Sequence, residues 1–126
     1  MAKIKKKAKI LIIEDDQFLA KMLGRILEST NFEIIMASSG QEGLRRANEQ
    51  PDLIILDIIL PDLDGFELLT RFKTDKAIKK IPILIISNLG QEEDIQRGLK
   101  LGAVDYIVKS DFSLNDVVSR VKKYIK

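Results

Sequence analysis

The sequence predicts a single α/β domain, residues 1–126, built on one doubly wound (βα)₅ parallel sheet. Short apolar runs recur along the chain with helix-like patterns between them, as repeated strand–helix units require. Four of the five runs are nearly unbroken in isoleucine, leucine and valine, which is typical of strands covered on both faces. No linker, internal repeat or low-complexity segment separates them, so the length fits one domain.

The predicted strands are the apolar runs themselves. They cover residues 9–14, 32–37, 52–57, 81–87 and 104–109. In a doubly wound sheet, the ligand site lies beyond the carboxyl ends of the strands, near the point where the strand order reverses. The residues that end or follow the first, third, fourth and fifth strands should therefore lie together. They are Glu14, Asp15, Asp16, Asp57, Ser87 and Lys109.

The first three helices are predicted from apolar spacing and from capping residues. An apolar stripe at helical spacing marks the first, formed by Leu19, Met22, Leu23, Ile26 and Leu27. Asp16 is the natural N-cap of this helix. Ser39 with Glu42 has the spacing of a capping box and predicts the start of the second helix. Asp64 is placed to cap the third. The buried side of that helix is expected to contain Phe66, Leu69 and Phe72.

The last two helices are predicted in the same way. The fourth should cover residues 91–100 and stop at Gly102, which can adopt the left-handed conformation of a helix end. Gly98 weakens this helix by about 1 kcal/mol relative to alanine. Ser113 with Asp116 predicts a capping box at the start of the fifth helix. Its inward residues are expected to be Leu114, Val117, Val118, Val121 and Ile125.

The composition excludes several kinds of active site. The chain has no cysteine and no histidine, which removes disulfides, thiolate nucleophiles, Ser-His-Asp catalysis and histidine metal ligands. The loop after the first strand is acidic rather than glycine-rich, so direct nucleotide binding is disfavoured.

The formal net charge of +2 is unevenly spread. Five lysines crowd the start of the chain: Lys3, Lys5, Lys6, Lys7 and Lys9. With no aromatic residues among them and no recognisable reading helix, they favour a solvated basic tail over residues 1–8 rather than a nucleic-acid site. The apolar run that follows is too short for a signal peptide or a membrane span, which favours a cytoplasmic protein without membrane insertion.

Asp57 is an acid at the end of an apolar strand, where a carboxylate is costly unless it has a function. Alone it would more often be incidental, but Glu14 and Asp15 are expected to lie within about 5 Å of it, where each like-charged pair costs about 3 kcal/mol. A divalent cation removes this repulsion, and all-oxygen ligands select a hard ion, Mg²⁺ or Mn²⁺. Metal binding is therefore favoured over the alternative of plain capping and solvation.

Lys109 and Ser87 extend this predicted site. Lys109 follows a buried strand and can act as a counterion that also holds a phosphoryl oxygen; the alternative is an ordinary surface lysine. Ser87 offers a hydroxyl to the same oxygens, although a turn serine at a strand end is common. A carboxylate nucleophile at Asp57, a hard cation, an ammonium and a hydroxyl form a phosphoryl-transfer site. The phosphoryl group must come from another molecule.

Four motifs carry a resemblance to a known family: "ILIIEDD" (10–16), "DIILPDLDGFELL" (57–69), "IIS" (85–87) and "GAVDYIVK" (102–109). In this order and spacing, they resemble a response-regulator receiver domain of two-component signalling, over essentially the whole chain. The resemblance is to a stand-alone, chemotaxis-regulator-like receiver. It implies a flavodoxin-like fold with strand order 2-1-3-4-5.

The resemblance also implies roles for the site residues. Asp57 would be the phospho-acceptor, and Lys109 would bind the phosphoryl group. Asp15 and Asp57 would be direct metal ligands, with Glu14 acting directly or through water and the backbone carbonyl of Ile59 completing the protein ligands. The implied donor is a histidine kinase or a histidine phosphotransfer protein, and the implied cofactor is Mg²⁺.

A two-state switch is part of the same implication. The phosphoryl group would draw Ser87 toward it, and Tyr106 would turn inward; the alternative for Tyr106 is a packed aromatic ring with a solvated hydroxyl. The altered surface of the fourth helix, fifth strand and fifth helix would then bind a downstream protein. Such a protein catalyses its own phosphorylation and dephosphorylation and is not a conventional turnover enzyme.

Three departures from the family pattern lead to further expectations. Ser110 follows Lys109 where the family usually has a proline in a cis peptide; because a cis bond before another residue costs about 2.5–4 kcal/mol, we expect a trans bond and a displaced loop. Asn88 replaces a small residue and either crowds the phosphoryl group or donates a hydrogen bond to it. Ile59 and Leu89 are apolar where fast-hydrolysing members place polar groups, so we expect slow loss of the phosphoryl group.

Two other functions compete with this interpretation. One is a constitutive, non-phosphorylated protein-binding module on the same fold. The other is a Mg²⁺-dependent hydrolase, which would need a second acid two residues after Asp57, where Ile59 stands instead. The sequence leaves the oligomeric state open between a monomer and a weak dimer.

Overall fold

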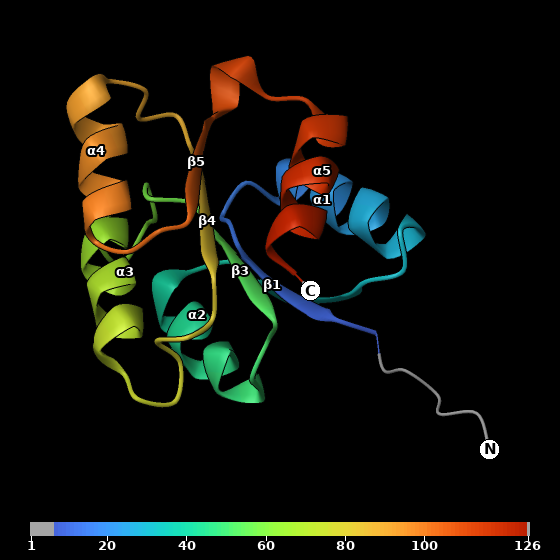
Figure 1. The fold of residues 1–126 in the computed structure, drawn as a ribbon, viewed down its shortest axis with the longest axis horizontal. Coiled ribbons are helices and arrows are strands. Elements are labelled where there is room, and N and C mark those ends of the chain that lie inside the picture. The colour runs from blue at the N-terminus through green and yellow to red at the C-terminus, as the bar shows by residue number, and fades with distance from the viewer. Residues whose placement is uncertain (1–6, 126) are drawn as a thin grey trace.

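Residues 7–125 are described by this computed structural model, and they form one parallel sheet between two layers of helices (Figure 1). The predicted basic tail, residues 1–8, lies almost entirely outside the described residues. The strands are β1 (Lys9–Ile13), β2 (Glu33–Ala37), β3 (Leu53–Leu56), β4 (Ile83–Ser87) and β5 (Asp105–Val108). Their order is β2-β1-β3-β4-β5 and every neighbouring pair is parallel, so the predicted flavodoxin-like sheet is confirmed.

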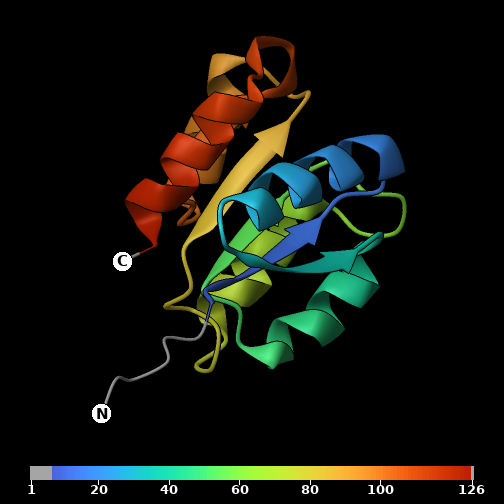
Figure 2. The same ribbon diagram turned by 90° about the vertical axis from the view of Figure 1, so that its right-hand side faces the viewer.

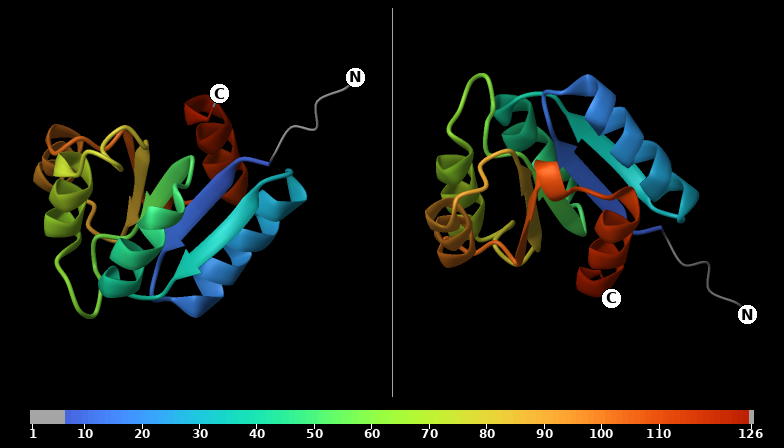
Figure 3. Two further views of the ribbon diagram at one scale, coloured as in Figure 1. Left: turned by 90° about the horizontal axis from the view of Figure 1, so that it is seen from below. Right: turned by 90° about the horizontal axis from the view of Figure 1, so that it is seen from above.

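The helices cover both faces of this sheet. They are α1 (Gln17–Ser29), α2 (Gly40–Arg46), α3 (Gly65–Thr74), α4 (Glu92–Lys100) and α5 (Leu114–Tyr124), with short 3₁₀ turns at Ala47–Glu49 and Lys109–Asp111. Figure 2 shows α1 and α5 in front of the sheet, and Figure 3 shows α3 and α4 on its other side.

Each layer of helices encloses its own hydrophobic core. Successive residues of a strand point to opposite faces of the sheet, so Leu11 and Ile13 of β1 belong to the core beneath α2, α3 and α4. Ile10 and Ile12 belong to the core beneath α1 and α5. Because β1, β3 and β4 are buried on both faces, they read as continuous apolar runs rather than as alternating ones.

Most of the predicted helix ends are confirmed. The Asp16 carboxylate accepts hydrogen bonds from two N–H groups in the first turn of α1, at 3.1 and 3.2 Å. The Asp64 carboxylate accepts one at the start of α3, at 2.9 Å. Gly102 has a φ of 114°, the left-handed conformation expected after α4.

The Lys109–Ser110 bond is trans, as predicted, since residues 7–125 contain no cis peptide.

Both predicted capping boxes form only in half. The Ser39 hydroxyl accepts from the Glu42 N–H at 3.2 Å, but the Glu42 carboxylate accepts from the backbone N–H one residue before Ser39. At α5 the Ser113 hydroxyl accepts from the Asp116 N–H at 3.1 Å, whereas the Asp116 carboxylate pairs with Arg120. In each case, another donor competes for the acid.

The strands are slightly shorter than predicted at one or both ends. β1 ends at Ile13 and β3 at Leu56, so Glu14 and Asp57 are the first residues beyond them. Their backbone N–H groups still bond to the neighbouring strands, at 3.0 Å each. Their positions are therefore fixed by the sheet. Among the described residues, no helix is both long and apolar enough to cross a bilayer.

Candidate functional site

The residues predicted to form a site do converge at the carboxyl edge of the sheet. Glu14 and Asp15 follow β1, and Asp57 follows β3, the neighbouring strand. Ser87 ends β4, and Lys109 follows β5. The strand order reverses between β1 and β3, so the acids lie at the switch point where doubly wound sheets bind their ligands.

Three carboxylates form the acidic part of this site. Glu14, Asp15 and Asp57 each offer an oxygen, and these oxygens lie within 4.8 Å of one another, which confirms the predicted spacing. Glu14 and Asp57 are buried, whereas Asp15 is exposed at the mouth. A compact group of hard oxygen donors that is open on one side fits a divalent cation such as Mg²⁺, which retains some of its waters.

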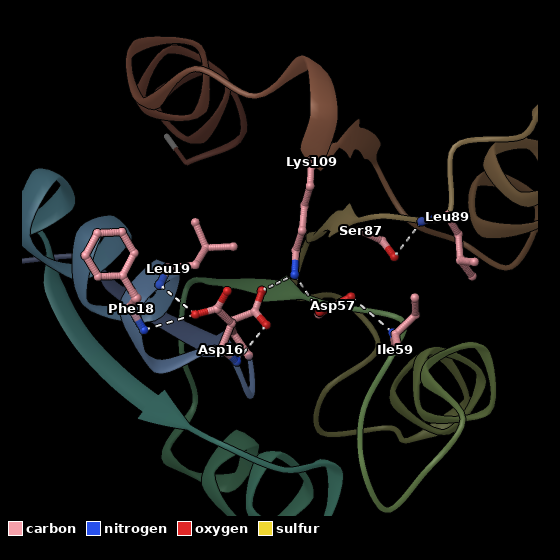
Figure 4. Close-up of polar contacts among 9 residues, drawn as sticks. Asp16, Phe18, Leu19, Asp57, Ile59, Ser87, Leu89 and Lys109 are labelled. Carbon is pink, nitrogen blue, oxygen red and sulfur yellow. Dashed lines mark hydrogen bonds and ion pairs between the residues drawn. The ribbon is translucent and has the colours of Figure 1, made fainter.

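Lys109 provides the positive charge that the buried acids need. Its Nζ donates to Asp57 Oδ2 at 2.8 Å and lies 2.9 Å from Glu14 Oε1. Figure 4 shows the side chain extending from the end of β5 toward Asp57. Burial opposes its charge, but the hydrogen bonds to Asp57 and Glu14 outweigh burial and raise the pKa of Lys109. Lys109 is therefore a partly buried counterion and not a surface lysine.

Glu14 is held mainly by Lys109 and by the start of the next loop. Its Oε2 accepts from the Asp16 N–H at 3.1 Å, and its Oε1 pairs with Lys109. Burial is the dominant influence and raises the pKa of Glu14 to about 7, even though the Lys109 hydrogen bond opposes the rise. At neutral pH, the protonation of Glu14 is thus sensitive to any further charge placed in the site.

Asp57 has a partner for each carboxylate oxygen. Oδ2 accepts from Lys109, and Oδ1 accepts from the Ile59 N–H at 3.0 Å. Ile59 itself is half exposed and borders the site, as Figure 4 shows. Its N–H bond to Asp57 keeps the Ile59 backbone beside the acids.

Ser87 and Tyr106 are linked through one loop residue. The Ser87 hydroxyl is fully buried and accepts from the Leu89 N–H at 3.3 Å. The Tyr106 hydroxyl donates to the Leu89 carbonyl at 2.6 Å. Tyr106 is 8% exposed, so its ring lies inward in this structure. Burial raises the pKa of its hydroxyl.

Asp62 has a structural role that sequence reasoning missed. Its carboxylate accepts from the Gly40 N–H at 2.8 Å and from the Gln41 N–H at 2.9 Å, at the start of α2. These bonds hold the loop that follows Asp57 against the start of α2, and they lower the pKa of Asp62. The partners lie more than twenty residues earlier, at separations of 22 and 21, so no local pattern could reveal them.

The comparisons with known proteins agree with this geometry. A family model described as the response regulator receiver domain matches residues 10–122. The alkaline phosphatase synthesis transcriptional regulatory protein PhoP of Bacillus subtilis is 40% identical over 119 residues, covering 94% of this chain and 48% of that protein. The phosphate regulon transcriptional regulatory protein PhoB of Escherichia coli is 34% identical, covering 94% of this chain and 52% of that protein. The chain thus spans about half the length of these relatives.

Solved structures give the same result for the fold. A putative response regulator from Chloroflexus aurantiacus superposes with a TM-score of 0.87 at 34% identity, covering 94% of this chain and 98% of that one. The chemotaxis response regulator CheY4 of Vibrio cholerae also has a TM-score of 0.87, at 27% identity, with 94% and 99% coverage. The chain therefore belongs to the response regulator receiver domain family.

Proposed function

We propose that this chain is a phospho-acceptor response regulator whose Asp57 receives a phosphoryl group from a histidine kinase or a histidine phosphotransfer protein. The observation that carries the proposal is the contact of Lys109 Nζ with Asp57 Oδ2 at 2.8 Å. Asp57 also belongs to a group of three carboxylates whose oxygens lie within 4.8 Å of one another. A buried acid paired with an ammonium, next to two further acids, has the charge arrangement that phosphoryl transfer requires. This charge arrangement gives no support to the alternative of a non-phosphorylated binding module.

Transfer to Asp57 forms one bond and breaks one. A carboxylate oxygen of Asp57 attacks phosphorus in line with the bond from phosphorus to the donor nitrogen, and that nitrogen leaves with the electron pair. Lys109 is close enough to move from the carboxylate to an oxygen of the arriving group. The Ser87 hydroxyl, bonded now to the Leu89 N–H, is a second donor for these oxygens.

Mg²⁺ is the cofactor we propose, with Mn²⁺ able to replace it. Asp15 and Asp57 would hold the ion directly, the Ile59 carbonyl would add a third ligand, and Glu14 would act directly or through water. The ion, when bound, offsets negative charge on the phosphoryl oxygens. The fit of three carboxylate oxygens within 4.8 Å supports this assignment.

Phosphorylation by a small-molecule donor tests the proposal. We expect incubation with acetyl phosphate and MgCl₂ to add the mass of one phosphoryl group, and Asp57→Asn to abolish the addition. Asp52→Asn is the matched control, because Asp52 and Asp57 flank the same strand, β3, at its opposite ends. An unchanged mass in the wild type, or labelling that survives Asp57→Asn, would refute the proposal.

The phosphoryl group should be lost slowly. Ile59 is 50% exposed beside Asp57 and offers no polar side chain to orient an attacking water. We expect a lifetime longer than minutes in a decay assay on purified protein, and faster decay for Ile59→Asn, whose amide can hold a water. A wild-type lifetime of minutes or less, or equal decay in both proteins, would contradict this explanation.

The output we propose is a protein contact on the surface of α4, β5 and α5. The phosphoryl group would draw Ser87, shift the loop after β4 and favour the inward Tyr106 ring, which changes this surface. We propose residues 1–126 as one receiver domain acting in the cytoplasm, without nucleic-acid binding, as a monomer or weak dimer. Sedimentation before and after acetyl phosphate treatment measures whether phosphorylation changes the oligomeric state.

A further inference from the structure

Gly98 is a glycine in the middle of helix α4, where glycine is among the least favourable residues. Its backbone does not require glycine, because Gly102 is the only glycine with a positive φ among residues 7–125. It is also the one buried residue of α4. A reason for Gly98 must therefore be sought in the space around it.

The Ile85 side chain and the Tyr106 ring fill that space. A Cβ atom on residue 98 would lie 3.1 and 3.2 Å from two carbon atoms of the Tyr106 ring, and 2.7 Å from Ile85 Cδ1. Ile85 is fully buried in the core, and Tyr106 is tied by its hydroxyl to the Leu89 carbonyl. Neither side chain can move away without losing packing or a hydrogen bond.

We propose that Gly98 is a positioning residue that admits the Tyr106 ring to its inward place and so couples helix α4 to the loop beside Ser87. The ring lies between the two: its Cδ2 and Cε2 atoms meet α4 at Gly98, and its hydroxyl donates to the Leu89 carbonyl, while the Leu89 N–H donates to Ser87. The role of this coupling in signalling rests on the proposed phosphorylation of Asp57, whereas the position of the Tyr106 ring does not.

The rest of α4 makes this contact important for the helix. No side chain caps its N-terminus, where Gln91 stands, and most of its residues are exposed. With little other burial, the helix takes its position from the contact at Gly98, from the partly buried Ile95 and from Arg97, whose guanidinium lies 4.3 Å from the centre of the Phe66 ring in α3. A Tyr106 ring that leaves its place therefore removes one of the few contacts that hold α4 to the rest of the domain.

Tyrosine fluorescence measures the ring directly. The chain has two tyrosines and no tryptophan, so in a Tyr124→Phe background Tyr106 is the single strong fluorophore. We expect acrylamide to quench Tyr106 weakly in this background and several-fold more strongly after Gly98→Ala. Gly24→Ala is the matched control: it adds a methyl to another buried helical glycine, where it meets the end of the exposed Met36 side chain.

A second variant distinguishes the clash with the Tyr106 ring from the clash with Ile85. It also provides a test if Gly98→Ala alone folds poorly. Ile85→Val removes Cδ1, the atom nearest to the added methyl. The pair Ile85→Val/Gly98→Ala should still expose the ring, measured against Ile85→Val alone. Unchanged quenching in a folded Gly98→Ala protein, or a rise in that variant without one in the pair, would overturn the proposal.

Two further measurements test the coupling. Alanine is the better helix former, so helix propensity alone predicts slower amide exchange in α4 of Gly98→Ala, whereas loss of the ring contact predicts faster exchange. With acetyl phosphate and MgCl₂, the phosphorylated fraction at steady state should be lower in Gly98→Ala than in Gly24→Ala. If no variant is phosphorylated, the proposed function fails while the quenching result stands. Slower exchange, or equal phosphorylated fractions, would overturn the coupling.

Discussion

Lys109 brings one positive charge to two almost fully buried carboxylates, those of Glu14 and Asp57. Its Nζ lies 2.9 and 2.8 Å from them, and 15% of its side chain is exposed. Removing one partner of a buried ion pair strongly destabilises a protein, because the charge that remains is buried without compensation. The stability of the fold with both acids ionised therefore depends on the Lys109 side chain.

Replacing Lys109 should lower stability as well as phosphorylation. We expect Lys109→Met, which keeps most of the stem, to reduce the free energy of unfolding by about 3 kcal/mol where Glu14 is ionised. Urea denaturation above pH about 7 measures the loss. Adding Asp57→Asn to Lys109→Met should recover part of it by removing one stranded charge. Equal stability of wild type and Lys109→Met would contradict the burial argument.

Glu14 should make the metal-free protein less stable as the pH rises. Its pKa is raised from 4.5 to about 7 by burial, so between these values the folded chain holds a proton that the unfolded chain has released. Its stabilising contribution is therefore complete below pH 4.5 and is lost as the pH rises through about 7. We expect Glu14→Gln to remove this component in urea denaturation with EDTA; an equal slope in the variant would disprove it.

At the scale of elements, the loop between β3 and α3 is held at both ends and in its middle. The Ile59 N–H bonds to Asp57 at one end, and Asp64 caps α3 at the other. Between them, Asp62 bonds to two N–H groups at the start of α2. A helix of seven residues has little stability of its own, so α2 and this loop order each other.

Removing the Asp62 carboxylate should loosen both partners. We expect Asp62→Ala to speed amide exchange at Gly40 and Gln41 several-fold, because two N–H groups lose their acceptor. Asp62→Asn keeps one acceptor oxygen and should give an intermediate effect. Its pKa is lowered by these bonds, so the contribution of Asp62 is present above its unfolded pKa and is lost on acidification. Unchanged exchange in Asp62→Ala would rule out this role.

For the molecule as a whole, a cation that binds only the folded site stabilises the entire domain. The gain is about 2.7 kcal/mol when the free ion is at about 100 times its Kd. We expect MgCl₂ to raise the melting temperature, and Asp15→Asn to reduce that rise. Asp15 is exposed, so its loss should not itself disturb the core. Asp52→Asn serves as control, and equal responses of all three proteins would exclude Asp15 as a ligand.

Much of the fold could be predicted because its signals are local. Unbroken apolar runs mark strands buried on both faces, and Asp16, Asp64 and Gly102 mark helix ends within a few residues of themselves. The convergence of Glu14, Asp57 and Lys109 also followed from the sequence, because parallel strands bring their carboxyl ends to one edge.

Contacts between distant segments could not be predicted. Neither the Asp62 bonds to α2 nor the space that Gly98 leaves for Tyr106 has a local pattern, and the halved capping boxes depend on which donor lies nearer in space. The sequence by itself determined the order of strands and helices, the edge that carries the site and the acids gathered there. Only the tertiary structure decided which oxygen meets which donor, because packing chooses among partners that the chain alone leaves equivalent.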